Sequence, residues 1–291
     1  MDVGVGLPTM IAGTHRRALI DWAVAADQAG FSTLAVLDRL VYDCWEPLVT
    51  LGVAAAVTER INLLSSVLLA PYRTDTAVLA KQAATVNLAS AGRLTLGMAV
   101  GLREDDYDAT GASYPDRGRR LDEMTRRMTA IWAGERVTDS PQPIGPMLAP
   151  ALAFGGQSEP AVRRAARLGR SWIAGGTSPM RYAKTLAWAR EVWEADGRTE
   201  EPRNIALCYY AVGEGAEERV RDYLGPYYSF VGEGFASRVI SQAVTSTDGL
   251  RAAVDRYREA GCDEVLFFPC ANELGQLEAL AEAAAPSPAG V

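Results

Sequence analysis

The fold is indicated most clearly by residues 88–107, which read LASAGRLTLGMAVGLREDDY. A helix ends before Gly92, which turns the chain, and an apolar strand is predicted over residues 94–100. The strand stops at Gly101, a charged loop follows, and residues 117–134 have the spacing of another helix. The charged side chains therefore come just after the carboxyl end of a strand, where ligands bind in α/β proteins.

Seven further apolar runs resemble this strand, and helical segments separate them. The eight predicted strands are residues 2–7, 31–37, 61–69, 94–100, 151–154, 171–174, 205–212 and 263–268. Their nearly continuous apolar character is typical of parallel strands that are covered on both faces. Eight such units within 291 residues predict an α/β protein of the (β/α)8 TIM-barrel class. A doubly wound open sheet is the alternative, but no G-x-G-x-x-G follows the first strand.

A single domain is expected over residues 1–285, followed by a disordered tail over residues 286–291. Residues 216–244 predict an enlarged helical crossover between strands seven and eight, with breaks near Gly225-Pro226 and at Gly232. The next helix is predicted from residue 247, with Asp248 as its cap.

Composition limits the classes of partner. The net charge is −7 and the pI is near 5.0, and no basic stripe is present, so we expect no nucleic-acid partner. No apolar run has the length of a transmembrane helix and no signal-type segment opens the chain, so we expect no membrane partner. The four cysteines include no C-x-x-C pair, which indicates free thiols and a cytoplasmic protein.

Few residues are available for catalysis without a cofactor. His15, the only histidine, is expected to cap the first helix, and the two lysines, Lys81 and Lys184, fall inside helices. A catalytic triad or a Schiff base therefore lacks its residues. Among strand ends only Asp38 and the acidic run at residues 104–106 could bind a metal, and they lie two strands apart, so we expect no metal site. The alternatives that remain are a barrel enzyme with a bound redox cofactor and a non-catalytic ligand-binding barrel.

Two glycine turns are candidates for binding a phosphate. Residues 155–158, which are Gly155, Gly156, Gln157 and Ser158, lie between a strand and a helix, where glycines allow close backbone approach and the helix N-terminus favours an anion. Residues 175–178, which are Gly175, Gly176, Thr177 and Ser178, form a similar, weaker case. A double glycine can also serve only as a tight turn.

Several of these segments resemble one known family. AKQAATVN (residues 80–87), SAGRLTLG (residues 90–97) and FGGQSE (residues 154–159) are similar to segments of the bacterial-luciferase-like superfamily. The resemblance implies an oxidoreductase that uses reduced FMN or F420, including monooxygenases, and a small organic substrate. It implies cofactor contacts at Asp38, Ser65, Ser66, Gly155, Gly156, Gln157, Ser158, Gly175 and Gly176, and a substrate loop at Gly101, Leu102 and Arg103.

Arg39 departs from the family pattern, because many members carry a histidine at this position. An arginine cannot act as a general base. It either pairs with Asp38 or the acidic run at residues 104–106, or it faces the reduced cofactor and stabilises its negative charge. In the second case, acid–base work would fall to Glu104 or to the substrate itself. Arg39 and Glu104 are therefore the candidate catalytic residues.

The helix predicted over residues 46–58 is apolar on every side. Such a helix is buried on more than one face. We therefore expect a homodimer that forms through the helices after strands two and three.

Overall fold

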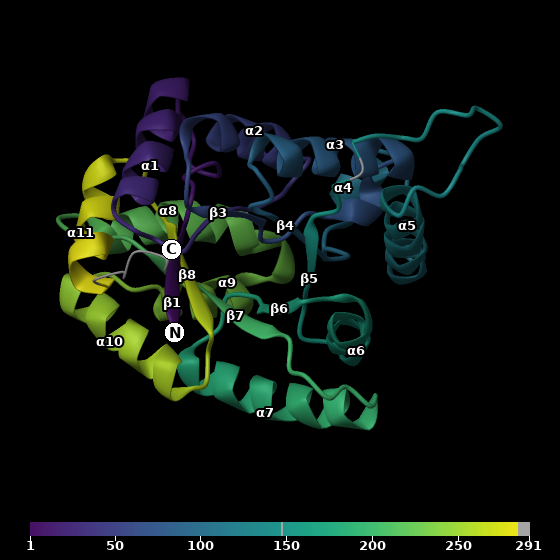
Figure 1. Ribbon diagram of the computed structural model, residues 1–291. Helices are drawn as coiled ribbons and strands as arrows, with labels where there is room; N and C mark the ends of the chain where they lie inside the picture. Colours follow the sequence, from purple (N-terminus) through teal and green to yellow (C-terminus); the bar gives the residue numbers. More distant parts are fainter. Residues whose placement is uncertain (147, 285–291) are drawn as a thin grey trace.

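The computed structural model describes residues 1–146 and 148–284. Eight parallel strands close into a barrel in chain order, surrounded by helices (Figure 1). The strands are β1 (Asp2–Gly6), β2 (Thr33–Val36), β3 (Asn62–Ser65), β4 (Leu94–Met98), β5 (Ala151–Gly155), β6 (Ser171–Ala174), β7 (Arg203–Tyr210) and β8 (Glu264–Pro269). Because β1 pairs with both β2 and β8, the predicted barrel is confirmed and the open-sheet alternative is wrong.

The helices lie on the outside of this barrel. They are α1 (Arg16–Gln28), α2 (Pro47–Val57), α3 (Thr76–Ala89), α4 (Glu104–Asp108), α5 (Arg117–Trp132), α6 (Glu159–Leu168), α7 (Pro179–Ala195), α8 (Ala216–Tyr228), α9 (Glu233–Gln242), α10 (Thr247–Glu259) and α11 (Leu274–Ala284). Two short 3-10 helices are η1 (Ala70–Tyr72) and η2 (Ser229–Val231). Helices α8 to α10 form the enlarged crossover that was predicted between β7 and β8.

Both faces of the strands are buried, which explains their continuous apolar sequence. In β2, Leu34 and Val36 pack in the core between the sheet and the helices, whereas Ala35 packs inside the barrel. Small residues make room in the interior: a Cβ atom at Gly6 would lie 2.3 Å from the ring of Phe268. The interior is therefore a packed core that leaves the two ends of the strands available for other roles.

Three local predictions are wrong. The charged segment after β4 contains helix α4 instead of a continuous loop. Helix α8 continues through Gly225 and Pro226 to Tyr228 and passes directly into η2, so only the predicted break at Gly232, whose φ is +102°, is found. The cap of α10 is Ser246, whose side chain accepts a hydrogen bond from the Gly249 amide, and Asp248 lies inside the first turn.

The predicted cap of the first helix is confirmed. His15 is the N-cap of α1 and accepts a hydrogen bond from the Ala18 amide. The described part of the segment between α5 and β5 has no helix or strand and extends away from the barrel (Figure 1, teal, upper right). The predicted tail, residues 286–291, lies outside the described residues. Among the helices described, none is long and apolar enough to cross a membrane.

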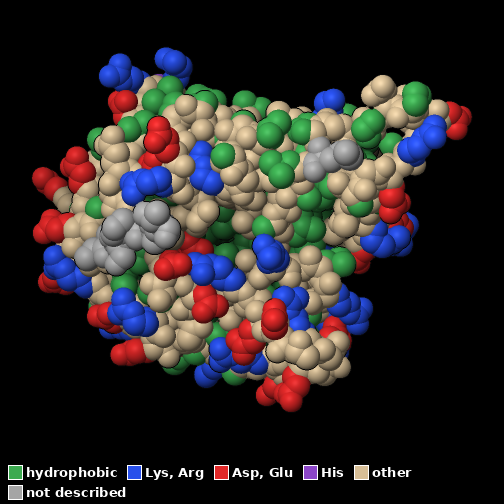
Figure 2. Space-filling view, in the orientation of Figure 1, with side chains coloured by type: hydrophobic (Ala, Val, Ile, Leu, Met, Phe, Trp, Pro, Cys, Tyr) green, Lys and Arg blue, Asp and Glu red, His purple; other side chains and the backbone are tan. Residues whose placement is uncertain are grey.

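Helices α2 and α3 carry an exposed apolar face. Val49 on α2, and Val78 and Leu88 on α3, are each more than half exposed. The opposite face of α2 is packed, since Leu48 and Leu51 belong to the core. In Figure 2 hydrophobic side chains gather over these two helices at the top of the view.

Candidate active site

Asp38 follows β2 and anchors the segment after β3. Its buried carboxylate accepts hydrogen bonds from the Leu69 amide and the Tyr72 hydroxyl, each at 2.7 Å. It also forms an ion pair with Arg73 at 2.7 Å. Burial and the neighbouring Asp38 raise the pKa of Tyr72, which therefore stays a neutral donor. Both oxygens of Asp38 are thus engaged within the protein, and its predicted contact with a cofactor stays a prediction.

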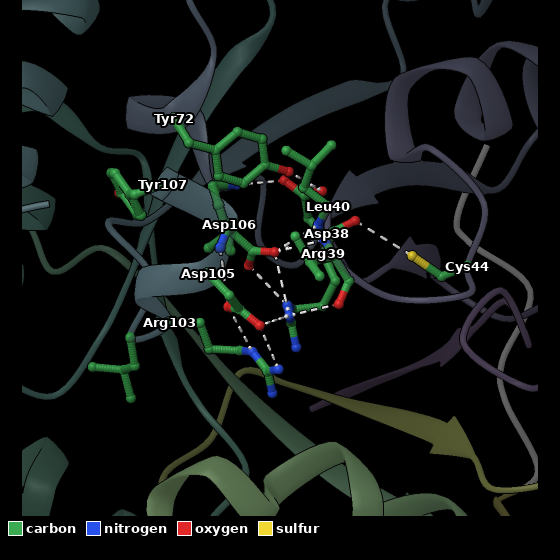
Figure 3. Close-up of polar contacts among 12 residues, drawn as sticks. Asp38, Arg39, Leu40, Cys44, Tyr72, Arg103, Asp105, Asp106 and Tyr107 are labelled. Atoms are coloured by element: carbon green, nitrogen blue, oxygen red, sulfur yellow. Dashed lines mark hydrogen bonds and ion pairs between the residues drawn. The ribbon is translucent and has the colours of Figure 1, made fainter. Parts of the chain in front are cut away.

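Arg39 is held by a carboxylate of the acidic run (Figure 3). Its Nε lies 2.8 Å from Oδ2 of Asp106, and its Nη2 lies 3.2 Å from Oδ1. Both side chains are almost completely buried, at 3% and 0% exposure. The amides of Leu40 and Val41 donate to the same Asp106 carboxylate. The pairing that the sequence left open is therefore made, and its partner is Asp106.

The rest of the loop after β4 links this ion pair to the crossover. Arg103 donates to both oxygens of Asp105, which also lies 3.5 Å from Arg39. Hydrogen bonding with Arg103 lowers the pKa of Asp105. Arg103 also donates to the Tyr227 carbonyl of α8, and its guanidinium lies 4.2 Å from the ring centroid of Phe230. Leu102 is exposed, and Gly101 turns the chain at φ +72°.

Glu104 is exposed at the start of α4. No ion pair or hydrogen bond of its side chain is found within residues 1–146 and 148–284. Asp106, two residues later, is the buried carboxylate of this helix. The sequence predicted Glu104 and not Asp106 as the functional carboxylate. The five residues of α4 are too few to show by their periodicity which side of the helix faces inward.

The two glycine turns are positioned by β5 and β6. The Gly156 amide donates to the Ile173 carbonyl, and the Trp172 indole donates to the Gly156 carbonyl. Gly156 has φ +127°, and a Cβ atom there would lie 2.8 Å from Ala161, so a larger residue would strain the turn whether or not a ligand binds. Gln157 is half-buried, Ser158 is the exposed N-cap of α6, and Gly175 faces open space. The space at these turns is compatible with an anion, and the predicted phosphate contacts stay predictions.

Unpartnered polar atoms gather at the carboxyl ends of the strands, which we call the barrel mouth. In the part of the chain that the structure describes, eight buried side-chain polar atoms lack a hydrogen-bond partner. Four of them follow strands at this end: Thr9 Oγ1, Arg39 Nη1, Ser66 Oγ and Thr177 Oγ1. Ser65, in contrast, donates to the Gly97 carbonyl. A buried polar group without a partner costs free energy, so these four atoms are candidates for hydrogen bonds to a ligand.

Thr9 was not predicted from the sequence, whereas Thr177 belongs to the weaker of the two predicted glycine turns. Thr9 lies beside a groove of about 360 Å³ that is also lined by Ile11, Asp43 and Cys44. Thr177 and Tyr209 line the same small pocket. The only sequence signal of Thr9 is a hydroxyl residue three positions after a strand, and many loop residues share that signal.

Tyrosines of the crossover cover the barrel mouth. Tyr223 and Tyr228 on α8 pack against Tyr209 of β7, and the hydroxyls of Tyr209 and Tyr228 are 2.8 Å apart. Tyr227 packs against Tyr223 and Tyr228. Burial raises the pKa of all four phenols, that of Tyr228 to about 12. The phenols are therefore neutral at physiological pH, and this side of the mouth is largely apolar.

Comparison with known proteins identifies the family. The model of the luciferase-like monooxygenase family matches residues 1–264, which include β1 to β7 and the first residue of β8. The chain belongs to the luciferase-like monooxygenase family. The family resemblance noted in the sequence is thereby confirmed.

Individual known proteins are similar to parts or all of the chain. A curated relative, the F420-dependent glucose-6-phosphate dehydrogenase of Beutenbergia cavernae, is 40% identical over an alignment of 134 residues that covers 42% of this chain and 39% of the relative. The chain thus matches about two fifths of the length of that relative. An F420-dependent secondary alcohol dehydrogenase in complex with an F420-acetone adduct superposes with a TM-score of 0.81, at 17% identity, covering 97% and 98% of the two chains. The oxygenating constituent of 3,6-diketocamphane monooxygenase from Pseudomonas putida, in complex with FMN, has a TM-score of 0.75 at 18% identity and 98% coverage of both chains. Both structures share the barrel fold.

Proposed function

We propose that the protein is an oxidoreductase that acts on a small organic substrate with FMN or F420 bound in the barrel mouth. When bound, the reduced form of either cofactor supplies a hydride equivalent. Membership of the luciferase-like family supports the proposal, as do the F420- and FMN-dependent proteins that resemble the chain. The observation that carries it is the set of four unpartnered polar atoms at the mouth.

The residues of the mouth fit such a cofactor in different ways. Ser66 and Thr177 offer buried hydroxyls to polar ring or ribityl groups, and the backbone of the turn at residues 155–158 offers amides and a helix N-terminus to the phosphate. The apolar crossover with its neutral tyrosines excludes water from the same space. In this proposal these side chains bind and orient the cofactor, and none of them reacts covalently.

Arg39 has a more specific part in this proposal. Its Nε and Nη2 are engaged by Asp106, so the guanidinium plane is fixed and its Nη1 is the group left to donate. Asp106 offsets much of the positive charge. We therefore infer that Arg39 acts through a positioned hydrogen bond to an oxygen or nitrogen of the reduced cofactor, with no proton transferred. Glu104, exposed on α4, stays the candidate for acid–base work.

Equilibrium dialysis against FMN and F420, each oxidised and reduced, tests the function directly. We expect one of the two cofactors to bind with micromolar or better affinity. Turnover of a substrate panel with that cofactor then separates an enzyme from a non-catalytic binding barrel. Retention of neither cofactor in either redox state would refute the proposal.

We also propose that the protein forms a homodimer through α2 and α3. The exposed side chains of Val49, Val78 and Leu88 support this, because an apolar face of this kind stabilises association by about 25 cal/mol per Å² buried. The barrel mouth lies at the ends of the strands and not on this face.

A further inference from the structure

The arginines that follow three neighbouring strands at the barrel mouth are each balanced by a carboxylate. The loops after β2, β3 and β4 supply one arginine each, and every one has a different aspartate as its partner: Arg39 with Asp106 at 2.8 Å, Arg73 with Asp38 at 2.7 Å and Arg103 with Asp105 at 2.8 Å. Figure 3 shows the first and third of these pairs side by side. Three positive charges thus meet three negative ones, and none of these arginines keeps an unbalanced charge for an anionic substrate.

Exposed apolar side chains lie next to these ion pairs. The amides of Leu40 and Val41 donate to the buried carboxylate of α4. The guanidinium of the arginine after Leu102 lies 4.2 Å from the ring centroid of Phe230, and Val231 comes next in the chain. We call this set of exposed side chains the apolar rim: Leu40, Val41, Leu102, Phe230 and Val231.

The apolar rim continues into the tyrosines that cover the mouth. Tyr42, directly after Val41, packs edge-on against Tyr227 of α8 with 5.5 Å between the ring centroids. Five of the twelve large hydrophobic side chains that are exposed within the described residues belong to this rim. Such a concentration of exposed apolar surface is typical of a binding site. Because it adjoins the mouth, we infer that a ligand of the mouth covers it.

We propose that the substrate of this protein is an uncharged, largely apolar molecule whose apolar part packs against the rim. A phosphate or carboxylate on the substrate would need an arginine or lysine without a counter-charge. It would also face the partly exposed carboxylate of Asp105. An apolar chain is instead bound by the removal of its surface and that of the rim from water. The inference rests on the proposed function and adds a class of substrate to it.

The test is calorimetric titration with 2-butanone, 2-hexanone and 2-octanone, with glucose and glucose 6-phosphate as the polar pair. The protein is titrated alone and saturated with the cofactor that dialysis identifies. We expect the affinity to rise by about tenfold from each ketone to the next, as the burial of two methylene groups supplies. Glucose 6-phosphate should bind no more tightly than glucose. Equal affinities for the three ketones, or a clear preference for glucose 6-phosphate over glucose, would overturn the proposal.

A pair of double variants locates the effect. Leu102→Gln/Val231→Gln removes part of the rim and should reduce the gain to about threefold per ketone. Leu148→Gln/Leu168→Gln is the matched control, since both leucines are exposed near the ends of α3 and α6, at the opposite end of the barrel. It should leave the gain unchanged.

The other outcomes of these experiments are distinct. An equal effect of the two double variants on the gain would overturn the role of the rim. A loss of the dimer in the rim variant, measured by light scattering, would show that the rim is a subunit contact and would also overturn the proposal. Absence of cofactor binding would refute the proposed function, whereas titration of the protein alone would still decide whether the rim binds an apolar ligand.

Discussion

Arg39 is the residue whose role depends most on its surroundings. Its guanidinium is fixed by Asp106, and its Nη1 has no hydrogen-bond partner within the described residues. We expect Arg39→Met to weaken binding of the reduced cofactor by about tenfold and of the oxidised form by much less, because a hydrogen bond to a charged group contributes about 1.5–3 kcal/mol.

Arg39→Lys is the matched variant, since it keeps the charge but loses the rigid fork. Dialysis of both redox states measures the difference. Equal losses in the two states would show that Arg39 serves only as the structural partner of Asp106.

Asp106 should matter for stability more than its neighbours do. Asp106→Asn leaves the buried guanidinium of Arg39 with only the partly exposed carboxylate of Asp105, 3.5 Å away, as a counter-charge, so the free energy of unfolding should fall by about 3 kcal/mol. Asp105→Asn, at a partly exposed carboxylate, should cost less than about 1 kcal/mol. Urea denaturation measures both, and similar losses for the two variants would contradict the buried pairing.

Cys44 should react slowly with alkylating agents. Burial, followed by the negative charge of Asp38, raises the pKa of this thiol from 9.0 to about 11. Because the thiolate is the reactive form, iodoacetamide labelling at pH 8 should be about a hundredfold slower than for an ordinary thiol. The rate should still rise tenfold per pH unit between pH 9 and 10.

The other three cysteines are buried, so intact-mass analysis of the wild-type protein and of Cys44→Ser assigns the label. Circular dichroism at each pH checks that the fold survives. A labelling rate that levels off near pH 9 would mean that Cys44 is more solvated than the structure shows.

At the scale of single elements, the cap of α10 offers a direct comparison between sequence and structure. Ser246→Ala removes the hydrogen bond to the Gly249 amide and should lower the free energy of unfolding by about 1 kcal/mol. Asp248→Ala, at the residue that the sequence suggested as the cap, should cost less than about 0.5 kcal/mol, because its pair with Arg251 is exposed. Thermal and urea unfolding measure the two changes in the free energy of unfolding. A larger loss for Asp248→Ala than for Ser246→Ala would show that Asp248 is the cap.

Elements with strong local signals were predictable from the sequence. Helix α5 (Arg117–Trp132) was predicted within residues 117–134, since Leu121, Met124 and Met128 recur at helical spacing and are buried. Helix α4 was not, because five residues are too few to show a period. The buried state of Asp106 depends on Arg39, 67 positions earlier in the chain, and a contact between such distant residues leaves no local pattern.

The same limit applies to the candidate site. The glycine turns and Arg39 could be named because each has a chemical signature in the sequence. Thr9 could not, because what distinguishes its hydroxyl is the absence of a hydrogen-bond partner within the described residues once the barrel has closed.

For the whole molecule, the exposed face of α2 and α3 predicts the oligomeric state. We expect light scattering at micromolar concentration to give twice the chain mass of 31.2 kDa. Val49→Arg/Val78→Arg should give monomers, because the charges would have to be buried at the interface. Met180→Arg, at an exposed apolar residue on α7, should leave the dimer intact. A monomeric wild-type protein would refute the dimer.

The pairing of β1 with β8 has a consequence for how the protein is made. Residues 2–5 are hydrogen-bonded in register with residues 264–267, so the barrel cannot close until nearly the whole chain has been synthesised. At a synthesis rate of about 5–20 residues per second, roughly 15 to 50 s pass between the synthesis of β1 and that of β8, its second neighbouring strand. During translation the nascent sheet therefore has an unpaired, apolar edge at β1 and another at the newest strand. We expect chaperones to shield those edges, and we expect release from the ribosome, not the folding of any one βα unit, to time the formation of the native barrel.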